Sequence, residues 1–307
     1  MTPEARPSIF LSAGEPSGDL HGAGLAEALR ERLPGVALEG FGGPRMAAAG
    51  VTIHCSIERL SGIGFGLVVT SVPRHWRLFS AARAAARQGR YPLAILIDYP
   101  GFHLRLAGAF RSAGTKVLYY IAPQVWAWRP GRIDRISRVV DRLATILPFE
   151  PAYFAARGVP SVFVGHPSLD RAWPSRAEAR ATLGLPGTEP VVGIFPGSRA
   201  GEIERNWPLF REVGRRMLLE GRCFAAVVAG TPSGYYPEPE GFRIHRGDST
   251  VVTAAATAVL AKSGTTTLEA AIAGTPMVVA YRTGWLTYHV ATRLMTVPSI
   301  SLVNLVA

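Results

Sequence analysis

A turn of small residues, Gly197-Ser198-Arg199, follows the apolar run Val191–Phe195, and a helical pattern begins directly after it. This order predicts a buried parallel strand, a tight turn and a helix whose first N–H groups lack intrahelical partners. Such N–H groups and the positive end of the helix dipole attract anions, and the planar guanidinium of Arg199 suits phosphate. Glu202 is within reach of Arg199 or of the first helical turn. The alternative is an ordinary strand-to-helix turn with an arginine on the surface.

A second turn of this kind, Lys262-Ser263-Gly264, follows the apolar run Ala258–Ala261 and precedes a helix that opens with three threonines. Its N–H groups and hydroxyls would hold a second part of a diphosphate, and Glu269 would accept hydrogen bonds from a ribose diol. The alternative is N-capping by threonine, with Glu269 in solvent. We predict a nucleotide diphosphate site made of Gly197, Ser198, Arg199, Glu202, Ser263, Gly264, Thr265, Thr266, Thr267 and Glu269.

Candidate bases follow two predicted strands in the N-terminal half. Asp98 ends the apolar run Leu93–Ile97, where a carboxylate can take a proton from a bound hydroxyl; the alternative is a cap on the loop before Pro100. The loop after Ser8–Ala13 offers a rival set of bases, namely Glu15, Asp19 and His21. In the same loop Gly14, Ser17 and Gly18 would cradle a phosphate, or form a purely structural loop. Its glycine spacing does not match GxGxxG.

Residues 61–79 are largely apolar and end in a basic, aromatic tail. If exposed, this segment would insert into the headgroup region of a membrane, with its arginines on anionic lipid. The alternative is a buried strand or helix. The predicted contact residues are Phe65, Leu67, Val68, Trp76 and Arg77.

Composition indicates a folded protein with room for two domains. Of 307 residues, 48% are hydrophobic and 18% charged, which is typical of globular chains. No apolar run approaches the roughly 18–20 residues that span a bilayer, and the N-terminus lacks a signal-peptide pattern. Cys55 and Cys223 lie far apart, which predicts buried thiols in a reducing cytoplasm.

The formal net charge of +11 is carried almost entirely by arginine and favours nucleic acid, an anionic membrane or a phosphorylated substrate as partner. Nucleic acid is the weakest of these, because the sequence has no zinc finger, RNA-binding aromatic motif or basic region before heptads. Neither a metal nor a cofactor is expected. The sequence has no Asp-x-Asp pair, and its histidines are not clustered as ligands.

Short apolar runs alternate with helical patterns, which predicts an α/β fold with parallel sheets. The predicted strands are 8–13, 36–41, 93–97, 116–121, 142–147, 162–164, 191–195, 224–229, 242–245, 258–261 and 277–281, and the first helix is 20–33. A polar stretch with three prolines and a short Arg/Ala/Glu-rich helix, 166–187, predicts a linker between domains 1–165 and 188–307. We expect two doubly wound, Rossmann-like domains facing a central cleft. The apolar end, 299–307, suggests that the second domain is incomplete.

Several motifs in order resemble the lipid-A-disaccharide synthase family, and the match covers nearly the whole chain. They are Ala13-Gly14-Glu15-Pro16-Ser17-Gly18-Asp19-Leu20-His21-Gly22-Ala23, Gly42-Gly43-Pro44 with Met46 and Gly50, Ile97-Asp98-Tyr99-Pro100-Gly101-Phe102, Ala122-Pro123-Gln124-Val125-Trp126-Ala127-Trp128, Pro148-Phe149-Glu150, Gly165-His166-Pro167, Pro196-Gly197-Ser198-Arg199 and Ser263-Gly264-Thr265-Thr266-Thr267-Leu268-Glu269-Ala270.

The resemblance implies a GT-B glycosyltransferase that joins UDP-2,3-diacylglucosamine to 2,3-diacylglucosamine 1-phosphate, releasing UDP with inversion and without a metal. It implies UDP in the C-terminal domain, Asp98 as base, the first loop on the acceptor phosphate, and a peripheral position on the cytoplasmic face of the inner membrane. It does not give the oligomeric state.

This sequence departs from the family pattern at a few positions. Leu67-Val68 stands where the family usually shows Glu-Val, which puts an acidic acceptor contact there in doubt. Gly101 and His103 stand where Asp and Asn are common, so the support of Asp98 differs. Two other functions stay open: another GT-B UDP-sugar enzyme such as a UDP-GlcNAc 2-epimerase, and a non-catalytic UDP-sugar or lipid-binding protein.

Overall fold

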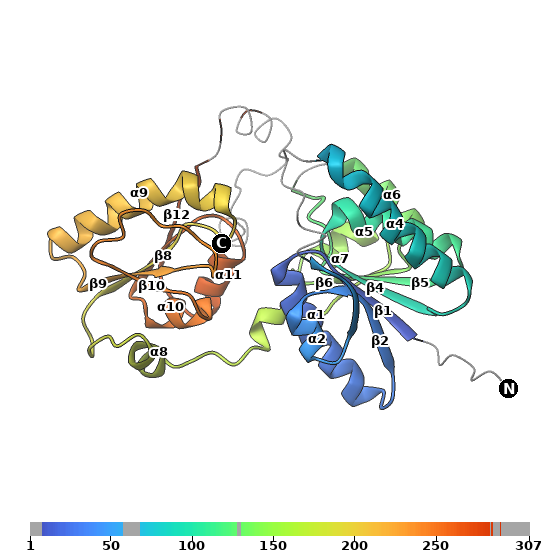
Figure 1. Ribbon diagram of the computed structural model, residues 1–307, viewed down its shortest axis with the longest axis horizontal. Helices are drawn as coiled ribbons and strands as arrows, with labels where there is room; N and C mark the ends of the chain where they lie inside the picture. Colours follow the sequence, from blue (N-terminus) through green and yellow to red (C-terminus); the bar gives the residue numbers. More distant parts are fainter. Residues whose placement is uncertain (1–7, 58–67, 128–129, 283, 285–288, 290–307) are drawn as a thin grey trace. The chain divides into compact units, whose positions relative to one another are not determined.

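The computed structural model describes residues 8–57, 68–127, 130–282, 284 and 289 (Figure 1). The chain divides into two compact units, Met1–Pro167 and Ser168–Ala307. Each unit is a parallel sheet with helices on both faces, so the predicted α/β class with two doubly wound sheets is confirmed.

Unit 1 has a seven-stranded sheet in the order β3-β2-β1-β4-β5-β6-β7, with parallel pairing throughout the described strands. The strands are β1 (Ser8–Ala13), β2 (Ala37–Gly42), β3 (Thr52–Ser56), β4 (Leu93–Ile97), β5 (Lys116–Tyr120), β6 (Arg142–Thr145) and β7 (Ser161–Phe163). The strand order reverses between β1 and β4. In such sheets ligands bind beyond the carboxyl ends of the strands at this switch point.

Alternating strand residues bury both faces of this sheet. Ile9 and Leu11 pack with α1 (Pro16–Arg32) and α2 (Pro44–Ala48), whereas Phe10 packs on the opposite face against Phe110 of α5 (Pro100–Ser112). The helices α4 (Val68–Arg87) and α6 (Ile133–Val139) flank α5, and α7 (Glu150–Ala155) follows β6 (Figure 1). No described helix has the length and apolar character that a bilayer span requires.

Unit 2 repeats the arrangement with five strands in the order β10-β9-β8-β11-β12. They are β8 (Val191–Phe195), β9 (Ala225–Ala229), β10 (Phe242–His245), β11 (Ala258–Ala261) and β12 (Met277–Val279), with helices α8 (Arg176–Thr182), α9 (Ala200–Leu219), α10 (Ser249–Ala255) and α11 (Thr265–Ile272). The switch point lies between β8 and β11. Trp207 and Phe210 anchor α9 on one face of the sheet.

One expectation about the elements needs correction. The helix α1 begins at Pro16, not Leu20, because proline suits the first helical turn, so Ser17, Gly18 and Asp19 are helical. The stretch predicted as a linker contains α8, which packs on α10. There the buried guanidinium of Arg180 donates to carbonyl oxygens of Ala255 and Glu189. Strand β3 was not predicted from the sequence.

Candidate active site

In unit 1 the motif residues follow the carboxyl ends of parallel strands and therefore gather along one edge of the sheet. Ala13 of β1 pairs with Ile97 of β4, so Gly14 and Asp98 come next on either side of the switch point. They are also linked by packing. A Cβ on Gly14 would lie 2.2 Å from a ring carbon of Tyr99, so only glycine fits against that ring.

Asp98 and Tyr99 both adopt left-handed backbone conformations, with φ of 48° and 52°. Such conformations cost about 1–3 kcal/mol each for non-glycine residues and cluster at functional sites. The Asp98 carbonyl oxygen accepts hydrogen bonds from Nδ1 of His103 at 2.7 Å and from the hydroxyl of Tyr119 at 2.5 Å. Its N–H donates to the Tyr120 oxygen at 3.0 Å. The surrounding fold therefore fixes the main chain of the predicted base.

Asp19, predicted as a rival base and acceptor contact, has a structural role. Its side chain is 2% exposed and accepts three N–H groups at the start of α2: Gly43 at 2.7 Å, Arg45 at 3.1 Å and Met46 at 3.1 Å. A carboxylate at a helix N-terminus satisfies donors that have no helical partner. Both carboxylate oxygens are thus engaged at the start of α2, and the role of Asp19, Glu15 and His21 as rival bases stays a prediction.

The remaining first-loop residues lie at the start of α1. Glu15 is the N-cap residue, Ser17 lies in the first turn, and Gly18 packs against Ala13. His21 faces His166, with ring centroids 6.3 Å apart, and burial lowers the pKa of His166. The motifs Gly14–His21 and Gly165-His166-Pro167 therefore meet at the same sheet edge.

In unit 2 the two predicted turns lie side by side. Phe195 pairs with Ala261, and Lys262 donates its N–H to the Phe195 oxygen at 3.0 Å, so both turns flank the switch point between β8 and β11. Each turn contains a glycine with positive φ. Gly197, with φ of 143°, lies three residues before α9 begins, and Gly264, with φ of 156°, is the N-cap residue of α11. The N-termini of α9 and α11 therefore lie at the same edge of the sheet, where their N–H groups can bind one anion.

The side chain of Glu202, predicted to contact the nucleotide, binds N–H groups at the start of its own helix, α9. Its carboxylate accepts from the N–H groups of Ser198 at 3.1 Å and Arg199 at 3.4 Å, and pairs with Nζ of Lys262 at 3.1 Å. Burial would raise the pKa of Glu202, but the charge of Lys262 and the Ser198 hydrogen bond lower it on balance. This carboxylate joins the two turns and holds the N–H groups that a phosphate would use. The Arg199 side chain is 65% exposed.

Glu269 lies within a polar network that also uses a residue missed by the sequence analysis. Its carboxylate accepts from Arg171 at 3.3 Å and from the Ser249 hydroxyl at 3.5 Å, and Arg171 also pairs with Asp248 at 3.0 Å. Burial raises the pKa of Glu269, with Arg171 acting in the opposite direction. Arg171 therefore orients Glu269.

The three threonines at the start of α11 differ in exposure. Thr265 is exposed, Thr266 is half-buried, and Thr267 is fully buried and donates its hydroxyl to the Gly264 oxygen at 2.8 Å. Thr267 therefore stabilises the turn. Buried Asn206 does the same for the other turn, donating to the Pro196 oxygen at 2.9 Å and accepting from the Arg282 N–H at 3.0 Å. A polar residue on the apolar face of a predicted helix was the sequence signal for Asn206.

Of the predicted membrane contacts, Phe65 and Leu67 lie outside the described residues, and Val68 begins α4. Trp76 is 68% exposed. Among the described residues, no three His, Cys, Asp or Glu side chains come together as a metal site.

Solved structures with this architecture include UDP-sugar enzymes. The UDP-GlcNAc 2-epimerase from Neisseria meningitidis bound to UDP-GlcNAc aligns with a TM-score of 0.61 and 9% identity, over 92% of this chain and 84% of that one. The glycotransferase of kitacinnamycin aligns with a TM-score of 0.60 and 16% identity, over 91% of this chain and 82% of that one. At such identities the likeness establishes the fold alone.

Sequence comparison goes further. The family model described as lipid-A-disaccharide synthetase matches residues 9–307. The lipid-A-disaccharide synthase of Anaeromyxobacter sp. (strain K) is 38% identical over 317 residues, which cover 100% of this chain and 82% of the relative. The chain therefore belongs to the lipid-A-disaccharide synthetase family.

Proposed function

We propose that Asp98 is the general base of a metal-independent, inverting transfer that joins UDP-2,3-diacylglucosamine to 2,3-diacylglucosamine 1-phosphate. The disaccharide synthesis follows from the family, and the left-handed Asp98 at the switch point of unit 1 carries the assignment of the base. In this reaction Asp98 takes the proton of the acceptor hydroxyl while that oxygen attacks the donor anomeric carbon. UDP leaves from the opposite face, which inverts the centre.

Departure of UDP leaves negative charge on the diphosphate, and we place this group at the starts of α9 and α11. The N–H groups there, with Arg199 and Lys262, would stabilise that charge. Glu202 now occupies the N–H groups of Ser198 and Arg199, so the diphosphate replaces its carboxylate or binds beside it on Lys262. Glu269, oriented by Arg171, is the proposed acceptor for the ribose hydroxyls.

Incubation with both lipid substrates tests this function. We expect UDP and a disaccharide 1-phosphate in equal amounts, in the presence of EDTA. UDP binding without disaccharide would favour a non-catalytic UDP-sugar-binding protein. Conversion of UDP-GlcNAc to its C2 epimer would favour the epimerase, with which the chain shares a fold.

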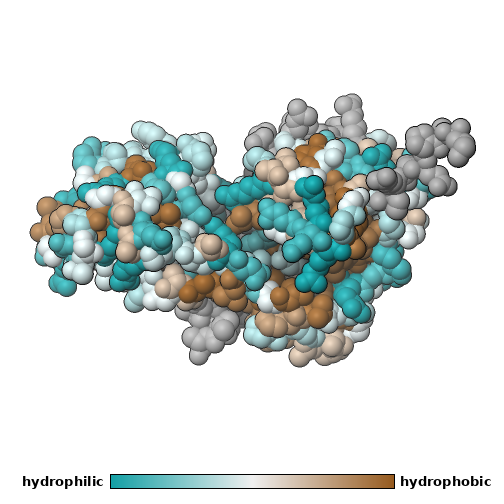
Figure 2. All heavy atoms as spheres, turned by 90° about the horizontal axis from the view of Figure 1, so that it is seen from below, coloured by the Kyte–Doolittle hydropathy of each residue, from teal (hydrophilic) through white to brown (hydrophobic). Residues whose placement is uncertain are grey.

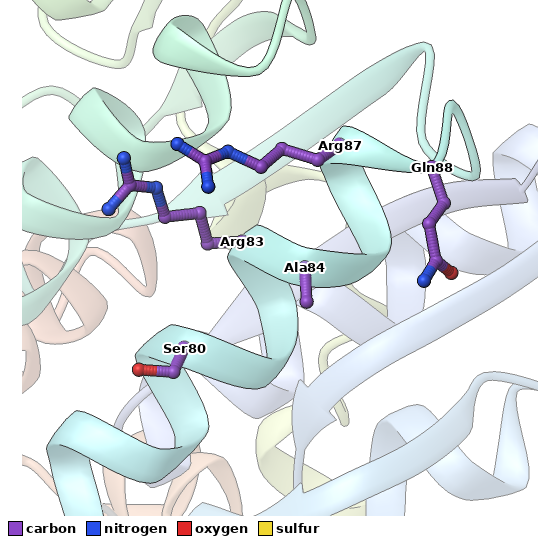
Figure 3. A pocket seen from close by; sticks show the side chains of 5 residues that line it. All are labelled: Ser80, Arg83, Ala84, Arg87 and Gln88. Atoms are coloured by element: carbon purple, nitrogen blue, oxygen red, sulfur yellow. The ribbon is translucent and has the colours of Figure 1, made fainter.

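We also propose that α4 contacts the anionic cytoplasmic face of the inner membrane. Figure 3 shows the guanidinium groups of Arg83 and Arg87 extending to the same side of α4 at an open pocket of about 390 Å³, which Ser80, Ala84 and Gln88 also line. The Nε atom of Arg83 is buried with no hydrogen-bond partner in the described part of the chain. Two guanidiniums one turn apart suit a lipid phosphate.

Vesicle binding distinguishes this patch from the general positive charge. Hydrophilic side chains are scattered among hydrophobic ones over both units on the face drawn in Figure 2. The chain has a formal net charge of +11, so positive charge alone does not single out α4. We expect the double variant Arg83→Gln/Arg87→Gln to lose binding to vesicles containing phosphatidylglycerol. The matched variant Arg215→Gln/Arg216→Gln, whose arginines pair with Glu212 on α9, keeps it. Equal losses in both variants would contradict the assignment to α4.

A further inference from the structure

The carbonyl oxygen of Asp98 has both of its acceptor positions filled by buried side chains from two different elements. His103 lies on α5 and Tyr119 on β5, and each is 0% exposed. Their contacts to the Asp98 oxygen are 2.7 Å from Nδ1 and 2.5 Å from the hydroxyl. A carbonyl oxygen has two lone pairs, so this pair of donors saturates it.

The protonation states of the two donors follow from their surroundings. A carbonyl oxygen only accepts, so the Nδ1 atom of His103 carries the hydrogen, and its Nε2 accepts from the Ser12 hydroxyl at 2.8 Å. Burial lowers the pKa of His103 to about 4, so the ring is neutral at physiological pH. Burial, together with the nearby Asp98, raises the pKa of Tyr119 far above its usual value, so its hydroxyl keeps its proton.

These hydrogen bonds offset the conformational strain of the left-handed backbone at Asp98 and Tyr99. Asp98 and Tyr99 are consecutive non-glycine residues with positive φ, and the Tyr99 oxygen also accepts the His103 N–H at 3.1 Å. Without the two donors, the Asp98 carbonyl oxygen would lose these two hydrogen bonds, while the strain of the backbone would remain. The carboxylate would then move with its main chain.

We propose that His103 and Tyr119 are positioning residues, which hold the Asp98 peptide in its left-handed conformation and so fix where the Asp98 carboxylate lies. The proposal rests on the proposed role of Asp98 as base. A misplacement of about 1 Å costs on the order of 100-fold in rate, so turnover reports the loss of this support.

Two substitutions at His103 separate positioning from simple packing. His103→Asn places an amide nitrogen where Nδ1 lies and keeps the donor to Asp98, while abandoning Ser12. His103→Gln reaches the Nε2 position and keeps the Ser12 contact, while abandoning Asp98. We expect kcat to fall about 100-fold in His103→Gln and by less than about threefold in His103→Asn, with KM for the UDP-sugar unchanged in both.

Two controls complete the test. Ser12→Ala removes the hydroxyl on Nε2 but leaves the Asp98 contact, so its kcat stays close to wild type. Thr145→Val, which removes another fully buried hydroxyl in unit 1, reports the effect of destabilisation alone. Equal losses of kcat in His103→Asn and His103→Gln, or losses that follow the thermal midpoint across all variants, would overturn the proposal.

A structural readout separates this proposal from the proposed function. In a crystal structure of His103→Gln/Tyr119→Phe we expect Asp98 to leave the left-handed region, and in His103→Asn to remain there. Persistence of positive φ at Asp98 in the double variant would refute the positioning role, whatever the activity. Absence of disaccharide from the unaltered chain would instead refute the proposed function.

Discussion

Asp98→Asn is the sharpest test of the proposed base, because it removes the proton acceptor and little else. Asparagine has nearly the same shape as aspartate and, among non-glycine residues, tolerates left-handed φ well. The main-chain bonds of Asp98 to His103, Tyr119 and Tyr120 therefore remain. Alanine tolerates the φ of 48° less well, so Asp98→Ala would combine the loss of the proton acceptor with a disturbance of the backbone.

The expected loss in turnover follows from the chemistry of the amide, which cannot take up a proton at neutral pH. General base catalysis contributes about 10²–10⁴-fold, so kcat should fall by that factor, which corresponds to about 2.7–5.4 kcal/mol in activation free energy. UDP affinity should stay unchanged, because the proposed diphosphate site lies in the other unit.

The assay measures UDP release and disaccharide formation at saturating donor and acceptor, with UDP affinity measured by calorimetry. Asp141→Asn is the matched control: it removes a carboxylate of unit 1 that pairs with Lys116 and accepts the Val117 N–H at 2.9 Å. This control should lower the thermal midpoint and leave kcat intact. Turnover within about threefold of wild type in Asp98→Asn would refute the reasoning, because general base catalysis typically contributes about 100-fold or more.

Three further outcomes are expected. Arg199→Ala should weaken UDP binding by about 1.5–3 kcal/mol if a charged hydrogen bond is lost, and unchanged affinity in a titration would make the turn structural only. Asp19→Asn should cost about 2 kcal/mol in urea unfolding with kcat of the folded protein unchanged, because it caps α2; a loss of kcat would restore Asp19 as a base. Burial would raise the pKa of Glu39, but hydrogen bonds, led by that of Arg90, lower it to about 2. The ionised Glu39 therefore adds up to about 3 kcal/mol to the free energy of unfolding above pH 4.5, and this contribution is lost as the pH falls toward 2. In Glu39→Gln the free energy of unfolding, measured by urea titration, should change less between pH 4.5 and pH 2 than in the wild type.

The sequence alone determined the fold class, most strands and the family. Buried parallel strands such as Val191–Phe195 are short apolar runs, and their hydrophobicity is local and therefore visible in the sequence. The first-strand, Asp98 and glycine-turn motifs could likewise be assigned to the ends of strands. Strand β3 escaped prediction because its sequence, TIHCS, is short and not continuously apolar.

Only the tertiary structure decided which carboxylates are engaged and which main chain is strained. The folded chain brings the N–H groups of Gly43, Arg45 and Met46 onto the Asp19 carboxylate, and the Lys262 ammonium onto that of Glu202. Likewise His103 and Tyr119 converge on the Asp98 oxygen from α5 and β5. Such contacts depend on distances between segments far apart along the chain, which local residue type and spacing do not contain.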